Sequence, residues 1–464
     1  MRTRATLWGL VLACLCAGYL VQAASPLRLN TDAIEFLEIA ASVSDGQGFL
    51  TNGKPSHYPP GYPLTLAALD HAGMAHSASL IGLNLAALGV GLACACFILS
   101  RSLGIGRDAL FLLASMTLLS WVIVKHATLP ISDVPYFGVS LASLALATRA
   151  AEARGRRKLV WLAGAAVLAA MAVSVRTIGV ALAPALAIAA VDDPSFAWNR
   201  IRRGWATHRR TALLGLAGVV VVLAAGGVVL ASTKYAHEMV RDWRGVGDLV
   251  RFRLEDWGDL LLNGSQAQLP GALQPLMMLA GLAFAGALAM GVRARRAVGP
   301  VDLYLGAYTA ILLVWPYRDA RFWVPVVPLL LGYAWVGFRD LATKRPAAAR
   351  WIGAGYLAGY AAMGLLAIAY TTWLTFSGDR FADRYGGGIY RASYLGAFGV
   401  EADDAPPSTI TGRADHSEER VDRVLRRFGP RRGWDSPGES RDYQSAGIDD
   451  APSGQGRTRG AGRS

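Results

Sequence analysis

Charged side chains are scarce in this sequence. Asp, Glu, Lys and Arg make up 17% of its 464 residues, whereas soluble domains average about 25%. Hydrophobic residues make up 53%, and the mean hydropathy is +0.33. This composition excludes a water-soluble globular domain and indicates a protein that is embedded in a membrane.

Cysteine is nearly absent as well. The four cysteines form two C-x-C pairs, Cys14 with Cys16 and Cys94 with Cys96, and both pairs lie inside apolar runs. A cysteine in such surroundings behaves as a small apolar residue. The pairs therefore indicate packing rather than a metal or redox site.

Long apolar runs are what the sequence has instead. A helix that crosses a bilayer needs about 17–25 apolar residues, and we interpret about eleven runs as transmembrane helices. The runs lie at about 5–24, 78–99, 109–125, 132–148, 159–175, 177–191, 211–232, 271–291, 299–316, 322–338 and 351–374. The fold class predicted is therefore an all-α polytopic membrane protein.

The formal net charge of +13 comes from Arg and Lys clusters between the runs. If the N-terminus with Arg2 and Arg4 is cytoplasmic, every dense cluster falls on the cytoplasmic side, as the positive-inside rule requires. The clusters are SRSLGIGRD, RAAEARGRRK, NRIRRGWATHRR, RARR and FRDLATKRPAAAR. Topology accounts for the basic charge, so we predict no nucleic-acid partner.

The same topology defines the outer surface of the protein, where we expect interfacial helices. It comprises about residues 25–77, 126–131, 233–270, 317–321 and everything after 375. In the large outer loop, 233–270, the stretch RDWRGVGDLVRFRLEDWGDL predicts one or two helices that line the acceptor side of a site.

Two domains follow from the composition. Residues 1–400 form the membrane domain, and residues 401–464, rich in Pro, Gly, Ser and mixed charge, form a disordered tail. Within the tail, HSEERVDRVLRRFG predicts a short amphipathic helix that is solvated or interfacial. The first apolar run has an alternative interpretation as a cleaved signal peptide, although its length favours a retained anchor.

Acidic residues follow the first run, in TDAIEFLEIA. Asp32 and Glu35 are spaced so that both lie near one face of a helix. They also match a capping box, with Asp32 as the N-cap and Glu35 at the third helical position. The two interpretations are compatible, because an N-cap carboxylate can also face a cleft.

A rigid aromatic segment, SHYPPGYPL, comes next. Its prolines fix the backbone in an extended or turned form, while His57, Tyr58 and Tyr62 carry polar tips suited to the membrane interface. The segment indicates either an aromatic belt with a stiff loop or a support for a site.

Further ionisable residues lie at the outer ends of later runs, in KHATLPISDVPYF, SVRTIGVAL and PYRDARFWVPVVP. They are Lys125, His126, Asp133, Arg176, Arg318 and Arg321. N-capping would explain Asp133, and pairing of Arg318 or Arg321 with Asp319 would explain those cations. An anionic ligand at the outer headgroup level explains the arginines as a set.

The ordered set of motifs resembles the GT-C glycosyltransferases. The motifs are D-x-x-E-F-L-x-I-A with G-x-G-F, Y-P-P-G-Y-P-L, S-D-V-P-Y, V-R-T-I-G and R-F-W-V-P-V-V-P. Over about residues 8–375 the chain is similar to the bacterial branch of the dolichyl-phosphate-mannose protein mannosyltransferase and lipid A aminoarabinose transferase superfamily.

The resemblance implies an enzyme of the bacterial cytoplasmic membrane with its active site facing outward. It would move a hexosyl or pentosyl group from a polyprenyl-phosphate carrier to a glycan, lipid or protein acceptor, among membrane lipids. Asp32 matches the catalytic carboxylate, Asp133 the second outer acid, and Glu35 matches less closely, since an adjacent acidic pair is usual. The basic residues and the aromatic segment imply binding of substrate or lipid phosphate: Arg176, Arg318, Arg321, Lys125, His126, His57, Tyr58 and Tyr62.

Two other classes of function compete with this one. A transporter or flippase of an anionic or lipid-linked substrate also needs outer cations, but it would show mid-span charge or repeat symmetry. A membrane scaffold or sensor would not need acids opposite arginines. Asp32, Glu35, His57 and Asp133 have ligand chemistry for a divalent ion, but the family resembled does not depend on one, so we predict no metal and no cofactor.

Overall fold

The computed structural model describes residues 2–191, 245–265, 274–295, 298–344, 346–377, 379–381 and 418–429. Helices dominate these residues, and the two strands described form one short hairpin in which Leu50 pairs with Pro55. The all-α polytopic prediction is thereby confirmed.

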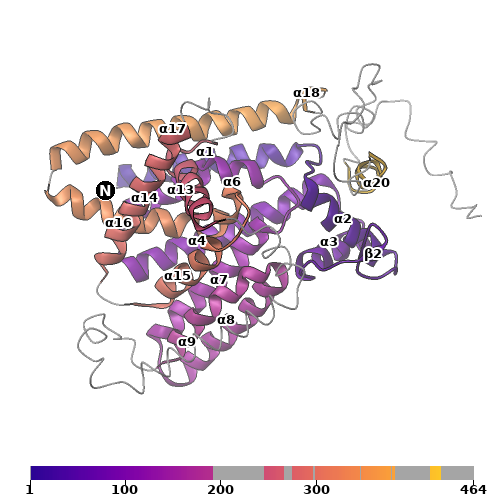
Figure 1. Cartoon of the computed structure of the whole chain (residues 1–464), viewed down its shortest axis with the longest axis horizontal. Helices are drawn as coiled ribbons and strands as arrows, with labels where there is room; N and C mark the ends of the chain where they lie inside the picture. Colours follow the sequence, from indigo (N-terminus) through magenta and orange to yellow (C-terminus); the bar gives the residue numbers. More distant parts are fainter. Residues whose placement is uncertain are drawn as a thin grey trace, which may run out of the picture.

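The elements before residue 192 are given first, and Figure 1 labels most of them. They are α1 (Arg2–Val21), η1 (Gln22–Ala24), α2 (Thr31–Ser44), β1 (Leu50–Thr51), β2 (Lys54–Pro55), α3 (Gly61–His71), α4 (Ser77–Leu103), α5 (Arg107–Leu119), α6 (Trp121–His126), α7 (Asp133–Glu152), α8 (Gly155–Val175), η2 (Thr177–Leu182) and α9 (Ala183–Ala190).

The elements after residue 244 complete the described fold. They are α13 (Val246–Leu262), α14 (Gln274–Arg293), α15 (Pro300–Leu313), η5 (Ala320–Val326), α16 (Val327–Lys344), α17 (Pro346–Thr375), α18 (Asp379–Phe381) and α20 (Glu418–Phe428).

Six helical stretches among the described residues are long and apolar enough to cross a membrane. They are Thr6–Ala24, Ser77–Leu103, Gly155–Val175, Gln274–Arg293, Ala320–Lys344 and Ala349–Thr375. Shorter apolar helices cover Thr177–Ala190 and Pro300–Leu313. The predicted run at 211–232 lies outside the described residues, so the total of eleven spans stays a prediction.

Glycines let several helices approach one another closely. A Cβ at Gly138 of α7 would clash with the backbone of Ala87 in α4, and one at Gly258 of α13 would clash with the backbone of Met277 in α14. Small residues serve the same purpose in other membrane helix pairs, because dispersion and shape drive their packing. These contacts bring α4 close to α7 and α13 close to α14.

The first outer loop forms a separate packing unit at one end of the helices. In Figure 1, α2, α3, β2 and α20 gather on the right, beyond the right-hand end of α17. Their buried side chains form a cluster that includes Ile34, Leu37, Tyr62, Leu66 and, from the C-terminal part, Val424. The predicted helices in this outer loop are therefore present.

The tail predicted to be disordered contains one ordered element among its described residues. Glu418–Phe428 is the amphipathic helix that the sequence indicates, but its apolar face is not solvated. Its apolar side chains Val421, Val424, Leu425 and Phe428 are buried against the first outer loop. The remaining residues of 401–464 lie outside the described part of the chain.

Candidate active site

Asp32 lies in the first turn of α2, and Asn30, not Asp32, caps that helix. The backbone of Asn30 is extended, with φ −133° and ψ 178°, and its Oδ1 accepts a hydrogen bond from the N–H of Ala33 at 2.8 Å. The predicted capping box with Asp32 and Glu35 is therefore wrong, because the asparagine two residues earlier takes the cap. Asp32 is left with its carboxylate available, at a helix end that favours negative charge.

Arg321 is the direct partner of Asp32. Its Nη2 lies 2.7 Å from Oδ2 of Asp32, and its Nε lies 2.9 Å from Oδ2 of Asp319. Asp319 also caps η5 by accepting the N–H of Arg321 at 2.9 Å. The expected pairing of Arg321 with Asp319 is thus present, and it orients the guanidinium toward α2.

Asp133 and Arg176 form a second ion pair beside the first. Asp133 is the first residue of α7, and one carboxylate oxygen contacts Nη1 of Arg176 at the junction of α8 and η2. The Arg176 and Arg321 guanidiniums lie 5.8 and 5.3 Å from the centre of the Phe322 ring. One aromatic side chain therefore supports both cations, an arrangement that adds cation–π attraction.

The two acids differ in their access to solvent. The side chain of Asp32 is 28% exposed, whereas that of Asp133 is 2% exposed. Arg176 is 21% exposed and Arg321 16%. Asp32 and Arg176 are therefore open to solvent, while Asp133 is enclosed behind the arginine that it contacts.

The junction at Arg176 depends on glycine. The N–H of Gly179 donates to the carbonyl oxygen of Arg176 at 2.8 Å, and a Cβ at Gly179 would clash with the backbone of Val173. A Cβ at Gly61, in the proline-rich segment, would likewise clash with the backbone of Ser174. The motifs V-R-T-I-G and Y-P-P-G-Y-P-L are thus packed against each other, next to the arginine.

The aromatic residues of that segment lie around α2. Tyr58 and Tyr62 contact the ring of Phe36 edge-on, with centroids 5.0 and 5.3 Å apart. Tyr62 is buried, and burial, followed by the neighbouring charge of Asp133, raises the pKa of its hydroxyl. His57 is exposed and stacks on Tyr58 at 5.1 Å.

Three predicted residues stand apart from the two ion pairs. Glu35 is partly exposed on α2 and makes no ion pair within the described residues. His126 is enclosed, with Nδ1 2.6 Å from the carbonyl oxygen of Val122. Lys125 is exposed, and its Nζ lies 5.6 Å from the centre of the Trp121 ring.

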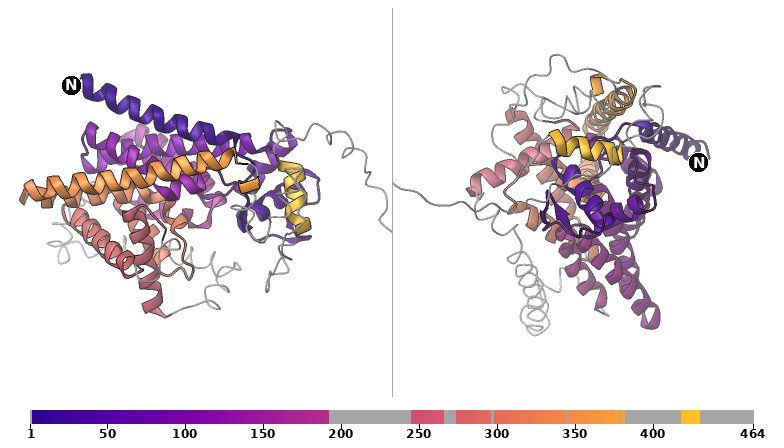
Figure 2. Two further views of the ribbon diagram at one scale, coloured as in Figure 1. Left: turned by 90° about the horizontal axis from the view of Figure 1, so that it is seen from above. Right: turned by 90° about the vertical axis from the view of Figure 1, so that its right-hand side faces the viewer.

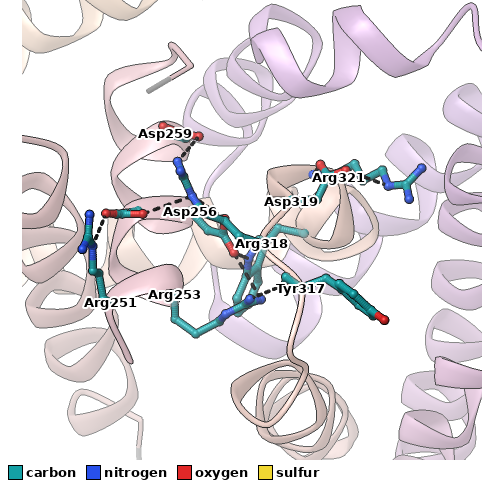
Figure 3. A network of polar contacts seen from close by, with 10 residues as sticks. Arg251, Arg253, Asp256, Asp259, Tyr317, Arg318, Asp319 and Arg321 are labelled. Carbon is teal, nitrogen blue, oxygen red and sulfur yellow. Dashed lines mark hydrogen bonds and ion pairs between the residues drawn. The ribbon is translucent and has the colours of Figure 1, made fainter. Parts of the chain in front are cut away.

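Arg318 points away from Arg321 and toward Asp259 of α13, as Figure 3 shows. Its Nε lies 3.2 Å from Glu255, and its Nη2 lies 3.7 Å from Asp259. Asp256 lies 3.1 Å from Arg253, and the indole N–H of Trp323 donates to it at 3.2 Å. The structure does not bring Arg318 together with Arg176 and Arg321.

Sequence reasoning did not single out these acids of α13. Burial raises the pKa of Asp256 to about 7, although Arg253, the Trp323 hydrogen bond and Arg318 each lower it. Their spacing in RLEDWGDL places Glu255 and Asp259 four residues apart on one helix face. That spacing is the signal that could have found them.

Arg28 was also missed. It is buried just after the first span, and its Nη1 contacts Oγ1 of Thr128, in the segment between α6 and α7. Within the described residues, no group of three or more His, Cys, Asp or Glu side chains is arranged so that it could hold a metal ion. The four residues considered for a divalent ion, Asp32, Glu35, His57 and Asp133, therefore form no such group.

Comparisons with known proteins give a fold. No protein-family model matches the sequence, and no curated protein does. The apo crystal structure of ArnT from Cupriavidus metallidurans matches with a TM-score of 0.50 and 16% identity, over 90% of this chain and 85% of that one. This likeness shows the fold alone, and the GT-C fold that the motifs predict is thereby confirmed.

Two further solved structures match less closely. ArnT from the same organism bound to undecaprenyl phosphate gives a TM-score of 0.48 and 14% identity, over 89% of this chain and 84% of that one. The oligosaccharyltransferase AglB from Archaeoglobus fulgidus, in complex with an inhibitory peptide and a dolichol-phosphate, gives 0.46 and 12%, over 83% of this chain and 59% of that one.

Proposed function

We propose that this chain is a membrane glycosyltransferase that moves a sugar from a polyprenyl-phosphate carrier to an acceptor on the outer side of the membrane. The observation that carries the proposal is the pair of arginines around an accessible carboxylate. Asp32 is 28% exposed and bound to Arg321, and Arg176 lies against the same phenylalanine ring as Arg321. The carrier belongs to the class of molecule bound to ArnT in one of its structures.

Asp32 is the general base in this proposal. An acceptor hydroxyl attacks the anomeric carbon as the bond from that carbon to the phosphate oxygen breaks. The hydroxyl proton passes to Asp32, and the phosphate leaves with the bonding electron pair. An ionised carboxylate within hydrogen-bond reach contributes about 10²–10⁴-fold to such a step.

Arg321 orients Asp32, because its guanidinium holds the carboxylate in an ion pair at 2.7 Å. Arg176 meets the leaving phosphate, on which negative charge grows in the transition state. Asp133 positions Arg176, and Tyr58 and Tyr62 support the face of α2 that bears Asp32. Glu35 is the second candidate base, and no metal or cofactor is part of the proposal.

Arg318, Lys125, His126 and His57 have smaller parts. Arg318 anchors its loop to α13 rather than binding phosphate. Lys125 and His57, both exposed, are proposed to meet lipid headgroups, whereas the enclosed His126 packs the end of α6. The two arginines of the cluster remain the proposed phosphate ligands.

The test is transfer of radiolabelled sugar from a panel of hexosyl and pentosyl polyprenyl phosphates, in membranes that contain the wild type, Asp32→Asn or Glu35→Gln. We expect wild-type transfer, near-complete loss in Asp32→Asn and a smaller loss in Glu35→Gln. Equal activity of Asp32→Asn and wild type would remove Asp32 as the base. Absence of transfer across the panel, with movement of the carrier between leaflets, would replace the enzyme by the transporter alternative.

A further inference from the structure

The C-terminal helix α20 packs against the first outer loop, which is distant from it in the sequence. Arg420 contacts Glu38, although 382 residues separate them. In the right-hand view of Figure 2, α20, drawn in yellow, crosses the outer-loop helices. The contact joins the last described element to α2, the helix that carries Asp32.

One end of α20 is fixed by a buried ion pair. Nε of Arg420 lies 2.8 Å from Oε1 of Glu38, and its Nη2 contacts Oε2 of the same carboxylate. The two side chains are 3% and 12% exposed. Thr51 of the β-hairpin donates to Glu38 at 3.3 Å and completes the contact. A forked pair of this kind has a defined geometry.

The other end of α20 is fixed by Arg427, seven residues later on the same face. Its Nη1 and Nη2 bind the two carboxylate oxygens of Asp45 at 2.7 and 2.8 Å, and its Nη2 also binds Asp70 of α3 at 2.6 Å. The hydrogen bonds from Arg427 lower the pKa of Asp45 despite its partial burial. One guanidinium therefore joins the end of α2 to α3.

Apolar side chains fill the space between the two arginines. Val421 and Phe428 are 0% and 1% exposed, and Val424 is 2% exposed. They pack in the same cluster as Ile34 and Leu37 of α2. The outer face of α20 carries Arg423, which is exposed.

We propose that α20 is an intramolecular clasp that holds α2 in the orientation that places Asp32 at Arg321. Glu38 and Asp45 lie in the middle and at the end of the helix whose first turn bears Asp32. Because a helix moves as a rigid rod, a tilt at the clasped end displaces the carboxylate. The consequence for catalysis rests on the proposed function, whereas the clasp itself does not.

The experiment compares full-length variants by hydrogen exchange of residues 31–44 and by sugar transfer. Arg420→Gln with Arg427→Gln removes both anchors, and Arg423→Gln is the matched control on the exposed face. We expect exchange to rise about tenfold or more in the double variant only. We also expect kcat to fall about tenfold with KM for the donor nearly unchanged, since positioning is lost and binding is kept. Arg420→Glu alone breaks the ion pair with Glu38. Adding Glu38→Arg to that variant restores a pair of opposite charges and should restore part of the slow exchange and part of kcat.

Each alternative outcome decides a different statement. Unchanged exchange in the double variant would overturn the clasp whatever the enzyme does. Faster exchange with unchanged kcat would overturn its positioning role. A wild type that transfers no sugar would overturn the proposed function, and the exchange rates alone would then establish or reject the clasp.

Discussion

Arg318 and Arg321 belong to one short loop, yet their guanidiniums bind different sets of carboxylates. Arg318 meets Glu255 and Asp259, which are 2% and 6% exposed and come from a single helix. Arg321 meets Asp32 and Asp319, which are 28% and 39% exposed. Figure 3 shows the two arginines pointing away from each other.

The difference separates an anchor from a site. The acids around Arg318 are enclosed, so their charge is satisfied within the protein and no ligand reaches it. The acids around Arg321 keep a face toward solvent, where an acceptor hydroxyl and a phosphate can approach. The exposure of the partner carboxylates, rather than the number of ion pairs or the exposure of the guanidinium itself, therefore distinguishes the proposed catalytic arginine from the structural one.

The largest effect should come from the exposed acid. Asp32→Asn keeps the shape of the side chain but removes the base, so we expect kcat to fall by about 10²–10⁴-fold. Glu255→Gln removes one of the enclosed acids that contact Arg318. We expect kcat to change by less than about tenfold and the melting temperature to fall. Transfer assays and thermal unfolding of the two purified variants test this contrast, and equal losses of kcat would contradict it.

A charge-conserving change should separate the two arginines next. Arg321→Lys keeps the cation but loses the fork that binds Asp32 and Asp319 together. We expect kcat/KM to fall by about 10²-fold, a loss of about 2.7 kcal/mol in transition-state stabilisation. Arg318→Lys should lose less activity, because its carboxylates do not touch substrate. Steady-state kinetics of both variants measure the ratio, and a greater loss in Arg318→Lys would reverse the assignment.

The free energy of unfolding should depend more on Arg318 than on Arg321, the opposite of the order expected for activity. Arg318→Gln removes a positive charge that balances the carboxylates of Glu255 and Asp259, and an unpaired buried charge is costly. Because Arg318 itself is 30% exposed, water softens the loss, and we expect about 1–3 kcal/mol. Thermal unfolding in detergent measures it. Arg101→Gln, which breaks an exposed pair with Glu152, is the control and should cost less than about 1 kcal/mol.

The sequence predicted much of this arrangement and missed a definite part. Apolar runs and Arg clusters predict helices and topology because membrane insertion depends on local composition. The same logic placed Asp32, Asp133, Arg176 and Arg321 on one surface. It could not assign different roles to Arg318 and Arg321. The two have the same charge and lie three residues apart, and neither property predicts which helix each will contact.

Other errors have equally physical causes. The capping box matched Asp32, but the cap depends on the backbone conformation of Asn30, which local sequence leaves open. The docking of α20 depends on contacts 382 residues apart, between Arg420 and Glu38. No periodicity within the tail identifies the surface that its apolar face will cover.

A pH comparison gives the smallest effect and tests the enclosed acids directly. Burial raises the pKa of Asp256 to about 7, against 3.8 for the unperturbed carboxyl. A raised pKa in the folded state means that the folded protein binds the proton more tightly than the unfolded chain does. The contribution of Asp256 to the free energy of unfolding is thus fully present below about pH 4 and is lost as the pH rises through about 7.

Asp256→Asn cannot titrate and should lack this dependence. We expect the melting temperature of the wild type, minus that of the variant, to decrease between pH 5 and pH 8. Arg253 and Arg318 favour the ionised form and limit the decrease, which is why it ranks last. Asp45→Asn is the matched control, because the hydrogen bonds from Arg427 lower the pKa of Asp45 from 3.8. Its contribution is already complete at pH 5, so this variant should show no such decrease over this interval. A difference that stays constant between pH 5 and pH 8 would mean that Asp256 is ionised throughout this interval, and that the anchor at Arg318 is an ordinary salt bridge.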